Sequence, residues 1–70
     1  MKRHFELIDD IQNISKFWEI SISGKTVVLI WGRIGTKAQN KSKQFDTNEG
    51  AKKFVEKMIR EKTNKGYVEK

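Results

Sequence analysis

The alternation of apolar and polar residues predicts two β-strands near the start of the chain. Residues 4 to 9 alternate in this way, and residues 16 to 23 repeat the pattern. In the second stretch Trp18 and Ile20 fall on one face and Glu19 on the other. A period of two residues is typical of a strand with one buried face. Both stretches are therefore expected to lie in a sheet that is covered on one side.

A third strand is predicted over residues 26 to 31, where every residue is apolar or β-branched. A continuous run of this kind is typical of a strand buried on both faces, so we expect this strand to be the most buried. Ser23, Gly24 and Lys25 precede it and signal a hairpin, because glycine supplies the positive φ of a tight turn.

The polar stretch Ala38 to Phe45 predicts a fourth strand whose register is ambiguous. Strict alternation places Phe45 on the same face as three polar residues, which are Gln39, Lys41 and Lys43. Three such residues cannot all be buried. Either a bulge interrupts the strand, or the strand is an exposed sheet edge that its lysines protect.

A helix is predicted after residue 46. Asp46 is a candidate N-cap, with Glu49 three residues further on, and Gly66 is a candidate for the C-terminal cap. Between them one apolar stripe recurs at helical spacing, formed by Ala51, Phe54, Val55, Met58 and Ile59. After the helix, Tyr67 and Val68 are free to fold over the sheet or to pair with its edge.

These elements together predict an α+β domain: an antiparallel sheet of four strands, or slightly more, with one C-terminal helix packed on one face. A chain of 70 residues has room for one small core, so residues 1–70 are expected to form a single domain. No apolar run approaches the roughly 20 residues of a membrane span, and no signal peptide is recognisable. We therefore expect a cytoplasmic protein with no membrane partner.

Cysteine is absent, which excludes disulfides, thiolate catalysis and zinc sites built on cysteine. The single histidine, His4, lies in the first predicted strand and is expected to be structural or to face solvent. Asp9 and Asp10 form a carboxylate pair without further ligands at a recognisable spacing. No catalytic constellation is present, so we predict that the chain is not an enzyme and has neither a metal site nor a cofactor.

The net positive charge of the chain arises in its second half. Residues 1 to 30 carry four basic and four acidic side chains, whereas residues 31 to 65 carry ten basic and four acidic ones. The last five residues cancel, so the whole net charge of +6 arises from residue 31 onward. Such asymmetry is typical of a protein that binds a polyanion, although it also serves solubility.

The third strand runs into Trp31-Gly32-Arg33, followed by Ile34 and Gly35. Tryptophan and arginine are frequent binding anchors, and glycine allows a tight bend and the close approach of another molecule. Three lysines follow before the next acidic residue, and these are Lys37, Lys41 and Lys43. An aromatic face beside lysines can stack on a sugar or a base while the ammonium groups hold phosphates. Alternatively, Trp31 belongs to the core and Arg33 covers it by cation–π stacking.

These residues resemble the WGR domain, a family found in poly(ADP-ribose) polymerases and in small bacterial proteins. The resemblance covers roughly residues 5 to 68. Its signature is Trp-Gly-Arg-Ile-Gly-Thr over residues 31 to 36, and Lys-Phe-Trp over residues 16 to 18 matches the family's entry into a strand. Further matches follow in and after the helix, at Ala51, Phe54, Lys62, Thr63 and Tyr67.

The resemblance implies an antiparallel sheet with one helix and a role in DNA binding. It assigns Trp31 to stacking on a backbone sugar, and Arg33 to a phosphate or to coupling between domains. The expected nucleic-acid-binding residues are Trp31, Arg33, Lys16, Lys37, Lys41 and Lys43. The expected partner is DNA, as duplex, end or nick. RNA would use the same side chains, and the alternative is a protein-interaction module that docks an acidic partner.

Overall fold

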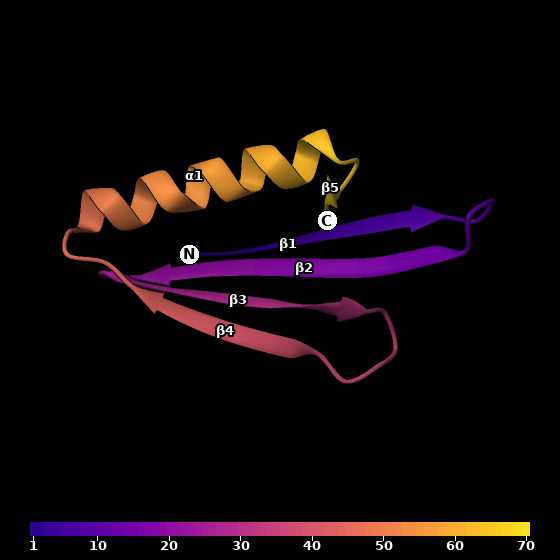
Figure 1. Ribbon diagram of the computed structural model, residues 1–70, viewed down its shortest axis with the longest axis horizontal. Helices are drawn as coiled ribbons and strands as arrows, with labels where there is room; N and C mark the ends of the chain where they lie inside the picture. The colour runs from indigo at the N-terminus through magenta and orange to yellow at the C-terminus, as the bar shows by residue number, and fades with distance from the viewer.

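A five-stranded antiparallel sheet carries one helix across one of its faces (Figure 1). The computed structural model describes residues 1–70. In chain order the elements are β1 Lys2–Asp9, β2 Ile14–Ser23, β3 Thr26–Arg33, β4 Gln39–Gln44, α1 Asn48–Asn64 and β5 Val68–Glu69. The strands are ordered β4-β3-β2-β1-β5 in the sheet. The predicted α+β architecture is confirmed, and the additional strand is the short β5, which pairs with the edge of β1.

The core lies between α1 and the face of the sheet to which the even-numbered residues of β2 point. Phe5, Trp18 and Trp31 are neighbours across β1, β2 and β3 and so share this face. Six side chains are fully buried, namely Phe5, Trp18, Ile20, Val27, Ala51 and Val55. All six are apolar, so the two layers are held together by hydrophobic burial from both sides.

The prediction that the third strand is the most buried was wrong. In β3 only Val27 is fully buried, whereas β2 contributes both Trp18 and Ile20. The reason is that α1 covers one face of the sheet alone, so Val28 and Ile30, on the other face, are only half-buried. An apolar run indicates two covered faces only when a second layer exists.

The ambiguity over the fourth strand is resolved in favour of an exposed edge. β4 pairs with β3 without a bulge, from Thr26 opposite Gln44 to Trp31 opposite Gln39, and all six of its residues are exposed. Phe45 follows directly and packs on Phe54, with ring centroids 5.1 Å apart. The lysine side chains thus lie on the open edge of the sheet, where charge opposes unwanted pairing with other chains.

The N-cap of the helix is Thr47 and not Asp46 as predicted. Thr47 has an extended backbone, with φ −136° and ψ 156°, and its hydroxyl oxygen accepts a hydrogen bond of 3.0 Å from the backbone N–H of Gly50. The helix starts one residue later than expected, which places Gly50 and not Glu49 at the third helical position, where a capping box needs a glutamate.

The helix ends as predicted, since Gly66 has a φ of +107°, which favours glycine. After the helix, Tyr67 packs against the core and Val68 continues into β5. The segment therefore both folds over the sheet and pairs with its edge, the two arrangements that the sequence left open. The helix has 17 residues, and it is neither long nor apolar enough to cross a membrane.

Candidate nucleic-acid interface

A pocket of about 420 Å³ opens at the end of the sheet where β2 begins and β3 finishes. The C-terminal part of α1 and the following Tyr67 close its other side. Its lining residues are Asn13, Ile14, Ser15, Lys16, Phe17, Trp31, Gly32, Arg33, Lys62 and Tyr67. Three of the six predicted binding residues, Lys16, Trp31 and Arg33, therefore meet in one pocket, and no acidic side chain lines it.

The register of the sheet brings Lys16 and Arg33 together. Lys16 of β2 lies directly opposite Arg33 of β3, so their side chains leave the sheet on the same face. Like charges in this position destabilise a strand pair unless an anion lies between them. Neither side chain forms an ion pair within the protein. The pocket consequently places two unpaired cations where an anion could bind both.

Trp31 belongs partly to the core and partly to the pocket. It packs against the buried cluster, yet it is only half-buried, whereas its neighbour Trp18 is 2% exposed. Arg33 is exposed and makes no cation–π contact with Trp31, which excludes the alternative that it serves as a cover for the indole. One part of the Trp31 ring system thus supports the fold while another remains available to a ligand.

Only one of the two glycines around Arg33 makes the turn. Gly35 has a φ of +86°, and a hydrogen bond of 3.1 Å from the N–H of Thr36 to the carbonyl of Arg33 closes the turn around it. Gly32 instead lies within β3, opposite Phe17. The strand therefore continues through Arg33, which holds the guanidinium on a rigid element and not on a flexible loop.

Lys62 is a pocket residue that sequence reasoning did not place in the site. Its ammonium lies 5.7 Å from the Trp18 ring and 5.4 Å from the Tyr67 ring. Burial lowers the pKa of Lys62, and the positive charges of Lys65 and Lys16 lower it further, against the opposing effect of Glu61. Its spacing, four residues after Met58 and three after Ile59, was the available signal, because it continues the sheet-facing stripe of the helix.

The remaining predicted lysines lie outside this pocket. Lys41 and Lys43 stand opposite Leu29 and Val27, which precede Arg33 by roughly 13 and 20 Å along β3. The Lys43 ammonium rests over Phe54, 4.9 Å from its ring centroid. Lys37 lies exposed in the loop between β3 and β4. Lys41 and Lys43 therefore extend the basic surface along the sheet edge, away from the pocket.

His4 takes part in a separate cluster on the uncovered face of the sheet. Its Nδ1 lies 2.8 Å from a carboxylate oxygen of Glu19 and its Nε2 lies 3.0 Å from one of Glu6. Hydrogen bonds with Glu6 and then Glu19 raise the pKa of His4, although partial burial opposes the shift. The ring also stacks on Phe17, with centroids 5.8 Å apart. These contacts occupy both ring nitrogens.

Comparison with known proteins points to one family and to relatives that are longer than this chain. The family model of the WGR domain matches residues 1–70. Protein YehF of Escherichia coli K12 is 39% identical over 67 residues, which are 96% of this chain and 24% of YehF. The uncharacterized protein YfeS of the same strain is 35% identical over 69 residues, which are 99% of this chain and 28% of YfeS.

A crystal structure of a Bacteroides fragilis protein has the same fold, with a TM-score of 0.93 and 41% sequence identity. The likeness covers 100% of this chain and 19% of that one. The chain therefore spans about a quarter of the curated relatives and about a fifth of the solved protein.

Proposed function

The chain belongs to the WGR domain family, and from this premise we propose that it is a non-enzymatic module that binds the backbone of DNA. The binding surface consists of the pocket around Trp31 and Arg33, continued along the edge strand β4. DNA ends and breaks are the preferred candidates, because the resemblance to the polymerase domains carries that role.

The observation that supports the proposal most is the set of unpaired cations around the partly buried indole of Trp31. Lys16, Arg33 and Lys62 line one pocket, and no carboxylate pairs with any of them. A nucleic-acid backbone alternates an apolar sugar face with a phosphate. Trp31 would pack on a sugar while the cations hold the adjacent phosphates. Contacts of this kind carry little sequence information, so we expect weak sequence preference and strong salt dependence.

The test is a titration of the protein with short nucleic acids at low salt, followed by tryptophan fluorescence. Trp18 is buried, so a change in emission reports mainly on Trp31. Nicked, gapped and blunt duplexes, plain duplex and RNA form the panel, which also separates RNA from DNA. Arg33→Ala should weaken the binding, whereas Lys53→Ala, on the exposed side of α1, should leave it nearly unchanged. An absence of affinity for every member of the panel would refute the proposal.

The alternative is a module that docks an acidic protein strand, and the open edge of β4 favours it. All six residues of β4 are exposed, and none of them is acidic. An extended acidic segment could pair with this edge while Lys41 and Lys43 meet its carboxylates. In that case Ser42→Pro would abolish binding of the acidic partner. Titration with DNA would then leave the tryptophan fluorescence unchanged both in the unmodified protein and in the Ser42→Pro variant.

A further inference from the structure

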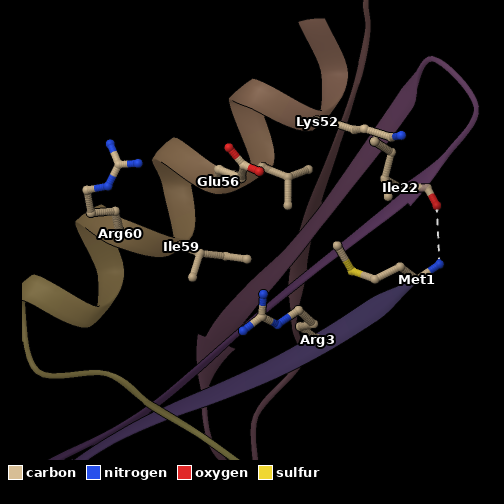
Figure 2. A pocket seen from close by; sticks show the side chains of 8 residues that line it. Met1, Arg3, Ile22, Lys52, Glu56, Ile59 and Arg60 are labelled. Carbon is tan, nitrogen blue, oxygen red and sulfur yellow. Dashed lines mark hydrogen bonds between the residues drawn. The ribbon is translucent and has the colours of Figure 1, made fainter. Parts of the chain in front are cut away.

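A second cavity, of about 460 Å³, lies between α1 and the first residues of the chain (Figure 2). Its lining consists of Met1, Arg3, Ile22, Lys52, Val55, Glu56, Ile59 and Arg60, a set that we call the helix groove. None of these residues lines the pocket of Trp31 and Arg33. The helix groove is thus a separate site, and it plays no part in the DNA-binding proposal.

The inner surface of the helix groove is apolar and incompletely covered. Val55 is buried, Ile22 and Ile59 are partly buried, and Met1 is 59% exposed. Figure 2 shows Ile59 projecting from the helix, and Met1 from the residue before β1, toward the same space. Apolar side chains that gather around an open cavity favour the burial of another apolar group there. The volume lies in the range of cavities that hold ligands.

The rim of the helix groove is predominantly cationic. Lys52 and Arg60 lie on α1, one turn to either side of Glu56, and none of the three forms an ion pair. Arg3 already holds a carboxylate, because its guanidinium donates hydrogen bonds of 2.7 and 2.6 Å to the two oxygens of Glu69. Two cations therefore remain free to meet carboxylates from outside, beside an apolar surface.

We propose that the helix groove docks an acidic segment of a partner protein, which inserts one large apolar side chain between Ile22 and Ile59. Charge complementarity selects this occupant, since Lys52 and Arg60 attract carboxylates on either side of the inserted group. A second copy of the chain is a poor occupant, because both copies carry the same cationic rim and a net charge of +6. As the two sites share no residue, DNA and the segment can be bound together.

The experiment uses two synthetic probes and records the methyl resonances of Ile22 and Ile59 by NMR. The acidic probe is acetyl-Asp-Glu-Phe-Asp-Glu-amide, and the matched probe replaces its four acidic residues with lysine. We expect the acidic probe to shift both methyl groups in a saturable manner, while the lysine probe leaves them in place. Duplex DNA added beforehand should not prevent the shifts, so failure of this proposal is distinguishable from failure of DNA binding.

Charge-reversal variants then test the rim. The double variant Lys52→Glu/Arg60→Glu should weaken the acidic probe about tenfold or more. The matched control is Lys53→Glu/Lys57→Glu, which changes the net charge equally at two exposed positions outside the groove and should alter affinity less than about twofold.

Three outcomes would overturn the proposal. The first is an absence of shifts at Ile22 and Ile59 in the unmodified protein at millimolar acidic probe. The second is an equal response to both probes or to both double variants. The third is a shift of the same methyl groups on dilution without any probe, together with a dimeric mass by sedimentation, which would assign the groove to a second copy.

Discussion

Replacement of Lys62 by glutamine should measurably reduce the salt dependence of DNA binding. Three cations line the pocket, and Lys41 and Lys43 extend the surface along β4, which makes five candidate phosphate contacts. Each contact contributes about −0.9 to the slope of log K against log salt concentration, so the unmodified protein should show a slope of about −4.5. Lys62→Gln removes one contact and should bring the slope to about −3.6.

The same relation predicts the loss of affinity at a given salt concentration. With the affinity extrapolated to 1 M salt unchanged, one lost contact weakens binding about eightfold at about 0.1 M salt and about sixtyfold at about 0.01 M. Because burial and neighbouring cations lower the pKa of Lys62, its charge is also lost earlier than that of an ordinary lysine as the pH rises. Affinity in the alkaline range should therefore fall more steeply for the unmodified protein than for Lys62→Gln.

Fluorescence anisotropy of a labelled blunt duplex, measured over a series of salt concentrations, checks both numbers. Lys57→Gln is the control, since it removes the same charge from an exposed position of α1 outside the pocket. If Lys62→Gln leaves the slope unchanged, or if Lys57→Gln reduces it equally, then Lys62 does not contact a phosphate. An equal reduction by both variants would show that net charge alone drives the binding.

Three further predictions concern stability. Ile20→Ala should lower the free energy of unfolding, measured by urea denaturation, by about 3 kcal/mol, because Ile20 is 0% exposed. The control Ile8→Ala should change it by less than about 1 kcal/mol, because Ile8 is 56% exposed. Similar losses in the two variants would contradict the assigned core. Thr47→Ala should cost about 1 kcal/mol and Asp46→Ala at most about half of that, with the reverse order refuting Thr47 as the N-cap. The folded-state pKa of His4 is raised above its ordinary value of 6.5, so its contribution to stability is complete below that value and is lost as the pH rises through the folded-state pKa. Urea midpoints at about pH 6 and about pH 9 should differ more in the unmodified protein than in His4→Gln, and an equal difference would show that other groups titrate.

Residue types and their order predicted several of the residues that line the candidate pocket. The run into Trp31 and Arg33, together with the family signature, identified two residues that line the pocket, and Lys16 came from the same resemblance. Lys62 was not predicted to belong to the pocket, because a lysine on a helix is expected to face solvent. It enters the pocket only because the fold places its ammonium over the rings of Trp18 and Tyr67. Conversely, Lys37, Lys41 and Lys43 are close to Arg33 in sequence, yet the turn at Gly35 leaves Lys37 in a loop and carries Lys41 and Lys43 onto the sheet edge.

The sequence by itself determined which segments become the four longer strands and the helix, and which residues of β1 and β2 share a face. These properties are local, since they depend on a period of two or about four residues and on the conformations that glycine permits. Only the tertiary structure decided how many faces of the sheet are covered, and therefore why β3 is half-buried and β4 is an open edge. It also decided that Lys16, Arg33 and Lys62 converge, because strand register and helix placement bring together residues far apart in the chain.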